Sequence, residues 1–111
     1  MRVLVTITPL MYREAIASSL QRSRPDFEVR IAAPQDAEEE LRGFLPHLLM
    51  RNDTDGLEDA GVLAGIPCRV EVLYSDGMDA KVIVDGRLEE VRDMSTQELL
   101  RVADRAASKA R

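Results

Sequence analysis

The chain has 111 residues, of which 45% are hydrophobic and 32% charged, a composition typical of one domain with a buried core. Its twenty acidic and fifteen basic residues give a net charge of −5, which argues against binding along a nucleic-acid backbone because that requires clustered cations. The single cysteine excludes an internal disulfide, and no apolar run reaches the roughly 20 residues of a membrane span. The apolar stretch 3–10 lacks a small-residue cleavage site, so we expect a cytoplasmic domain without a signal peptide.

The first third of the chain predicts a strand, a helix and a second strand. Residues 2–7 are rich in β-branched side chains without polar alternation, which favours a strand buried on both faces of a parallel sheet. Thr8 can cap a helix, and proline suits a first helical turn. The helix is predicted over 9–23 from apolar or small residues at helical spacing, namely Met11, Tyr12, Ala15, Ile16, Ser19 and Leu20. A period of two over 27–31 predicts the next strand, parallel to the first.

The following segment predicts a second helix and a third parallel strand. Residues 36–45 carry three glutamates in their early turns, where carboxylates suit the positive end of a helix. Helix propensity alone would extend this helix through 47–50. Pro46 argues for a break, and the alternation of strands and helices favours a strand over 47–51.

The second half predicts antiparallel strands. After an acidic connection at 52–65, residues 68–74 alternate as a strand. Asp85-Gly86 separates two further strand patterns within 81–91 and accepts the positive φ angles of a type I′ turn. We therefore expect the strands between 68 and 91 to join the sheet in antiparallel orientation.

The last helix is predicted over 96–109. It starts at a capping box, in which Ser95 and Glu98 satisfy each other's free backbone amides. Its C-terminal turns carry basic residues, which suit the negative end of the helix dipole. The alternative is an interaction face that binds the glutamates of the second helix in a symmetric homodimer, formed by Arg101, Arg105 and Lys109.

Two stretches resemble the start of a response-regulator receiver domain, in which a buried strand runs into a helix with an Arg-Glu-Ala-Leu pattern. They are Arg2-Val3-Leu4-Val5-Thr6 and Leu10-Met11-Tyr12-Arg13-Glu14-Ala15-Ile16. Arg24-Pro25-Asp26 and Leu45-Pro46-His47-Leu48-Leu49 extend the resemblance over residues 2–53. The resemblance implies one α/β domain over 1–111, with a flavodoxin-like βαβαβ start, a mixed sheet, a C-terminal antiparallel hairpin and a final helix.

The chain departs from the receiver pattern where phosphorylation takes place. Receivers hold Mg²⁺ with two acids at the end of the first strand, beside the phosphorylated aspartate. The corresponding positions here are Ile7 and Thr8, and the acceptor position is Asn52, which cannot form an acyl phosphate. The resemblance therefore implies a pseudo-receiver, a non-catalytic regulatory or protein-interaction module without a cofactor. Its predicted partners are proteins, including a second copy, and neither nucleic acid nor membrane.

A competing interpretation is a small-ligand-binding or metal-dependent enzyme. Five polar residues follow the predicted strands, at the carboxyl edge where open α/β sheets bind ligands: Thr8, Asn52, Asp53, Ser75 and Asp76. Ser75 also stands where receivers carry a switch hydroxyl. Helix capping and turn formation explain the same residues without any ligand.

Two further patterns have structural explanations. The acidic loop around Gly56 resembles a calcium loop, but the match places Arg51 at its first position and Val62 at its last, where carboxylates are needed. His47 and Cys68 are the only residues of their types, and a nucleophilic pair would require them to meet in space. Cys68 begins a strand pattern, so burial as a small hydrophobic residue is the favoured interpretation.

Overall fold

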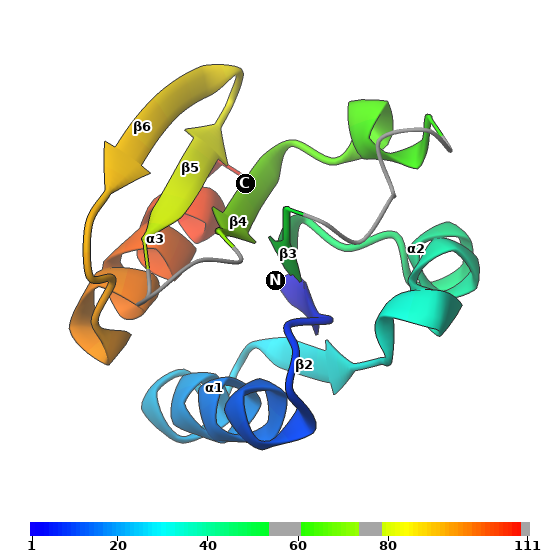
Figure 1. Cartoon of the computed structure of the whole chain (residues 1–111), viewed down its shortest axis with the longest axis horizontal. Helices are drawn as coiled ribbons and strands as arrows, with labels where there is room; N and C mark the ends of the chain where they lie inside the picture. Colours follow the sequence, from blue (N-terminus) through cyan, green and yellow to red (C-terminus); the bar gives the residue numbers. More distant parts are fainter. Residues whose placement is uncertain (54–60, 74–78, 110–111) are drawn as a thin grey trace.

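The computed structural model describes residues 1–53, 61–73 and 79–109 (Figure 1). Within these ranges the protein is an α/β globule in which three α-helices pack against a mixed, six-stranded sheet. The strand order is β2-β1-β3-β4-β5-β6. The elements are β1 (Arg2–Val5), α1 (Leu10–Ser23), β2 (Glu28–Ile31), η1 (Pro34–Asp36), α2 (Ala37–Phe44), β3 (Leu48–Asn52), η3 (Val62–Gly65), β4 (Cys68–Val72), β5 (Ala80–Val84), β6 (Arg87–Val91) and α3 (Thr96–Lys109).

The strand orientations correct one prediction. β4 is parallel to β3, with Leu48 opposite Cys68, whereas the sequence was interpreted as antiparallel from residue 68 onwards. The connection from 53 to 67 explains the difference, because a crossover of about a dozen residues or more can return the chain to the same edge of the sheet. Antiparallel pairing begins only with β5 and continues to β6.

Local signals for the third strand and the hairpin are confirmed. β3 forms where the helix and strand interpretations competed, and all five of its residues are buried. The helix before it ends as Leu45 adopts a left-handed φ of 51°, ahead of Pro46. Asp85 and Gly86 both have positive φ, 53° and 83°, as a type I′ turn requires.

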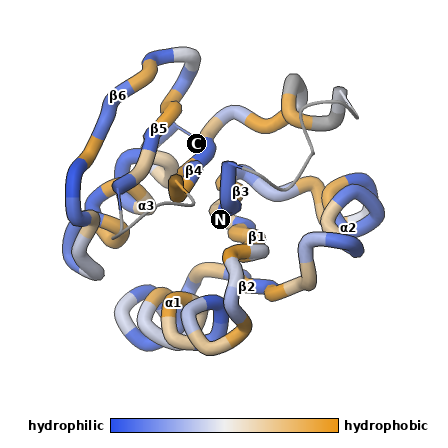
Figure 2. Tube along the Cα trace, in the orientation of Figure 1, coloured by the Kyte–Doolittle hydropathy of each residue, from blue (hydrophilic) through white to orange (hydrophobic). Residues whose placement is uncertain are grey.

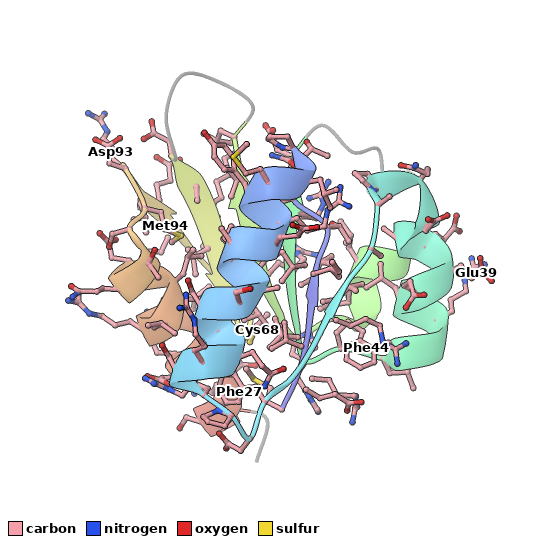
Figure 3. All side chains as sticks on the ribbon, turned by 90° about the horizontal axis from the view of Figure 1, so that it is seen from below. Phe27, Glu39, Phe44, Cys68, Asp93 and Met94 are labelled. Carbon is pink, nitrogen blue, oxygen red and sulfur yellow. The ribbon has the colours of Figure 1, made fainter. Side chains whose placement is uncertain are left out.

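The sheet divides the core into two parts. α1 and α3 cover one face, and α2 with η3 covers part of the other (Figure 1). In Figure 2 hydrophobic residues concentrate on the central strands, whereas hydrophilic stretches interrupt β6. In Figure 3 Phe44 lies on the sheet-facing side of α2 and Glu39 on its outer side, so this helix is amphipathic as predicted. Of the helices in the described ranges, none is both long and apolar enough to cross a bilayer.

Candidate functional site

Thr8 and Asn52 meet at the carboxyl edge of the sheet, where the sequence placed a polar pocket. Asn52 is the last residue of β3, and Thr8 follows β1. The Asn52 Oδ1 atom accepts two hydrogen bonds from Thr8, from the backbone N–H at 2.7 Å and from the hydroxyl at 3.0 Å. A carbonyl oxygen has two lone pairs, so Thr8 fills its capacity. We call this pair of bonds the Thr8–Asn52 clamp.

The clamp corrects the predicted helix cap. α1 begins at Leu10, Pro9 is its N-cap residue, and no side chain caps the helix. The backbone carbonyl of Pro9 instead accepts the N–H groups of Tyr12 and Arg13, at 3.0 and 3.2 Å. Thr8 does not cap α1, because its hydroxyl is bonded to the neighbouring strand.

Ile7 belongs to the core, although the receiver resemblance aligns it with a metal-binding acid. Its side chain is 1% exposed and packs in the larger core cluster. The buried Arg13 of α1 donates from Nε to the Ile7 carbonyl at 3.0 Å, which fixes the start of the helix to the segment that follows β1. This position therefore serves packing.

The other predicted pocket residues are only partly described. Asp53 is half-buried and its backbone N–H donates to the Val72 carbonyl at 3.0 Å, one residue beyond β3. Ser75 and Asp76 lie outside the described residues. The structure thus brings Thr8, Asn52 and Asp53 to one edge, as the strand-end argument predicted.

Exposed apolar side chains stand next to the clamp. Leu10, Met11 and Tyr12 open α1, and they are 51%, 74% and 51% exposed. Met11 and Tyr12 belonged to the helical spacing that predicted this helix, but their side chains do not enter the core. Ile16 and Leu20, further along α1, are the residues that enter the core. We call Leu10, Met11 and Tyr12 the α1 apolar patch.

A buried ion pair between β3 and β4 was not foreseen. Arg51 is fully buried, and its guanidinium contacts the carboxylate of Glu71, its cross-strand neighbour. Arg69 adds a second cation, with Nε 3.8 Å from Glu71 Oε2 and Nη1 donating to the Leu63 carbonyl at 3.2 Å. Because Arg51 and Glu71 are twenty positions apart on neighbouring parallel strands, only the strand register could have revealed the pair, and β4 was predicted with the wrong orientation.

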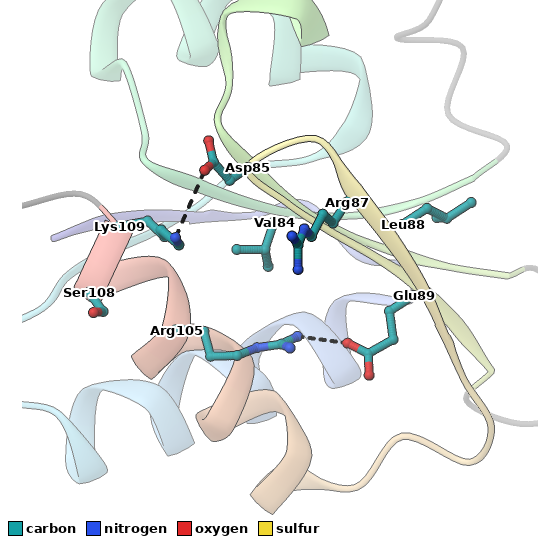
Figure 4. A pocket seen from close by; sticks show the side chains of 8 residues that line it. All are labelled: Val84, Asp85, Arg87, Leu88, Glu89, Arg105, Ser108 and Lys109. Atoms are coloured by element: carbon teal, nitrogen blue, oxygen red, sulfur yellow. Dashed lines mark hydrogen bonds and ion pairs between the residues drawn. The ribbon is translucent and has the colours of Figure 1, made fainter.

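The basic residues of α3 face the β5–β6 hairpin. Arg105 donates to Glu89 at 3.0 Å, and Lys109 lies 3.9 Å from Asp85, across a surface hollow of about 620 Å³ (Figure 4). Arg101 lines a smaller hollow nearer the start of the helix. Two of the three glutamates of α2, the predicted partners, make ion pairs within the chain: Glu38 with Arg42 of the same helix, and Glu40 with Arg30 of β2. The dimer through Arg101, Arg105 and Lys109 stays a prediction.

His47 directly precedes β3, and Cys68 is the first residue of β4. Both therefore lie at the amino edge of these parallel strands, opposite the clamp. His47 Nδ1 accepts the backbone N–H of Arg2 at 3.0 Å. Burial, followed by the charges of Arg2 and the N-terminus, lowers the pKa of His47. Cys68 is buried in the core, and burial raises the pKa of its thiol, so it stays a protonated, apolar side chain. His47 thus holds the backbone of β1, and Cys68 fills the core.

In the ranges 1–53, 61–73 and 79–109, no group of three His, Cys, Asp or Glu side chains could hold a metal ion. No known protein family, curated protein or solved structure matches the chain.

Proposed function

We propose that the chain is a non-catalytic protein-interaction module with a regulatory role, related to receiver domains that have lost their phosphorylation site. The Thr8–Asn52 clamp carries this proposal. At the edge where a receiver would bind Mg²⁺ and phosphate, the amide oxygen of Asn52 is saturated by Thr8, and the neighbouring Ile7 side chain is in the core. An amide in this state is neither a nucleophile nor a free cation ligand.

The strand order supports a relationship to receivers. Four parallel strands in the order β2-β1-β3-β4 agree with the flavodoxin-like arrangement, which handles ligands at the carboxyl edge. The antiparallel β5 and β6 stand where a receiver would continue with a helix and a parallel strand. Because a fold does not determine an activity, the functional part of the proposal depends on the residues at that edge.

The α1 apolar patch is the proposed contact with a protein partner. Leu10, Met11 and Tyr12 open α1, two residues after Thr8 of the clamp. Methionine and tyrosine are favoured in protein interfaces because they bury large areas and adapt to a partner. A partner with a complementary apolar surface would bury these exposed side chains.

Affinity capture from a native lysate tests this contact. The double variant Leu10→Ser/Met11→Ser removes the apolar surface, and Arg22→Ser, in the last turn of the same helix, is the matched control. We expect proteins retained by the wild type and by Arg22→Ser to be lost with the double variant. Retention of the same proteins by all three forms would refute the proposed contact.

A further inference from the structure

β6 is an edge strand whose outer backbone groups face away from the sheet. The N–H of Leu73 donates to the Asp79 carbonyl at 2.8 Å, and that of Asp85 donates to the Pro67 carbonyl at 3.1 Å. Antiparallel strands alternate between hydrogen-bonded and non-hydrogen-bonded residue pairs. The backbone N–H and C=O groups of the odd-numbered residues of β5 therefore bond to β4, and those of the even-numbered residues bond to β6. Val84 and Val82 pair with Arg87 and Glu89. The N–H and C=O groups of Leu88 and Glu90 consequently point to the free edge.

The side chains of β6 divide between the two faces of the sheet. Glu89 lies opposite the buried Val82 and bonds Arg105 of α3, so Arg87 and Glu89 lie on the α3 face. Leu88 lies opposite Ile83 on the other face and is 60% exposed. In Figure 4 Arg87 extends into the hollow between the two ion pairs, and Leu88 points away from it. Among the described residues, Arg87 makes no ion pair.

The charges along β6 are complementary to a second copy of the same strand. If two β6 strands pair antiparallel about a two-fold axis at Leu88, the two Leu88 side chains meet on one face. On the other face Arg87 of each copy lies opposite Glu89 of the partner subunit, twice over. Glu89 uses Oε2 for Arg105, and a carboxylate accepts hydrogen bonds at both oxygens. Axes at Glu89 or Glu90 would instead place identical carboxylates opposite each other, which is destabilising.

The other edge of the sheet is less suited to pairing. Arg30 of β2 is bonded to Glu40 at 3.2 Å, and its guanidinium lies 4.5 Å from the centre of the Phe44 ring. A cross-strand ion pair through β2 would therefore have to recruit a cation that already makes two contacts within the chain. On β6, by contrast, Arg87 makes no ion pair with the described residues, although Glu89 is bonded to Arg105.

We infer that β6 binds β6 of a second copy of this chain, antiparallel and centred on Leu88, so that the two sheets become one continuous sheet. Strand addition of this kind takes its affinity from main-chain hydrogen bonds and its specificity from side chains. The interface is small, so we expect a reversible dimer with a Kd between about 1 µM and 1 mM. The inference does not depend on the proposed function, and it uses a different surface.

Cysteine crosslinking of the purified protein tests the register. In a Cys68→Ala background, Leu88→Cys places two thiols in a hydrogen-bonded pair with Cα atoms about 5.5 Å apart, within reach of a disulfide. Glu90→Cys, on the same face of the same strand, is the control. Its thiols would lie roughly 13 Å apart, four residue steps along the strand. We expect Leu88→Cys to form a covalent dimer at least about tenfold faster under mild oxidation. Equal rates, or a faster Glu90→Cys, would overturn the inference.

Sedimentation equilibrium of charge variants provides a second test. Arg87→Glu places like charges opposite each other, and we expect its dimer Kd to rise about tenfold or more. The swap Arg87→Glu/Glu89→Arg/Arg105→Glu re-forms both pairs between the copies, and the Glu89–Arg105 pair within each chain, with reversed signs, so it should restore the affinity. A monomeric wild type at about 1 mM, or a dimer indifferent to Arg87→Glu, contradicts the inference. Because these measurements use pure protein, they are independent of the lysate capture.

Discussion

At the scale of single residues, one amide oxygen, Oδ1 of Asn52, joins the segment after β1 to the end of β3. Thr8 and Asn52 were both predicted as ligand-pocket residues because each follows a strand, and that argument correctly placed them together. It could not predict the bonds between them, because these depend on how far the chain continues beyond β1. The same polar residues that suggested a pocket therefore form a structural clamp.

The clamp predicts unequal effects on stability. Asn52→Ala removes an acceptor and leaves two Thr8 donors in a partly buried place, which should lower the free energy of unfolding by about 2 kcal/mol. Thr8→Val removes the hydroxyl and keeps the backbone bond, so it should cost roughly 1 kcal/mol. Urea unfolding of the two variants and the wild type measures the difference. A smaller loss for Asn52→Ala than for Thr8→Val would contradict the clamp.

His47 predicts a stability that depends on pH. Its pKa is lowered in the folded state, mainly by burial, so folding favours the neutral ring that accepts the Arg2 N–H. This contribution is complete above the ordinary pKa of about 6.5 and is lost as the pH falls below it. Between about pH 7.5 and 5, the wild type should therefore lose more unfolding free energy than His47→Gln, measured by urea titration at both pH values. Parallel losses would show that His47 is not the group responsible.

At the scale of elements, local signals and the parallel pairing of β1, β2 and β3 could be predicted, whereas the orientation of β4 could not. The type I′ turn, the capping box and the break at Pro46 depend on neighbouring residues, and the structure confirms the turn, the strand after Pro46 and the bond from the Glu98 N–H to Ser95 at 3.2 Å. The orientation of β4 depends on the path of the preceding connection, which carries no local signal. The exposure of Met11 and Tyr12 likewise depends on how α1 lies across the sheet.

The capping box gives a prediction for α3. Ser95→Ala removes the acceptor of the Glu98 N–H and should lower the free energy of unfolding by about 1 kcal/mol. Gln97→Ala, an exposed change within the same turn, should have little effect. Thermal and urea unfolding of both variants compare them, and equal stabilities would show that Ser95 does not stabilise the helix.

The ion pair between β3 and β4 should be costly to break. Glu71→Ala takes away a carboxylate that compensates the fully buried Arg51 and the nearby Arg69, so we expect a loss of roughly 3 kcal/mol. Glu90→Ala, an exposed acid on β6, is the control and should change stability by less than about 0.5 kcal/mol. If the two variants unfold at the same urea concentration, the buried pair does not hold these strands together.

At the scale of the whole molecule, the fold presents three surfaces of different chemistry. The carboxyl edge carries the clamp and the α1 apolar patch, the amino edge carries His47, and the free edge of β6 carries matching charges. The sequence predicted the α/β class, the third strand and the C-terminal hairpin from periodicity and turn residues. It could not predict which surfaces the helices leave open, because that depends on the packing of all three helices against one sheet.

The most direct test of a closed carboxyl edge is thermal unfolding with Mg²⁺ and beryllofluoride, which imitates a phosphoryl group. A ligand that binds the folded state raises the Tm, so the melting temperature reports whether the edge can receive the pair. We predict the same Tm with Mg²⁺, with beryllofluoride and with both together. A rise of several degrees that requires both, and that Asn52→Ala abolishes, would show that this edge performs the chemistry we propose it has lost.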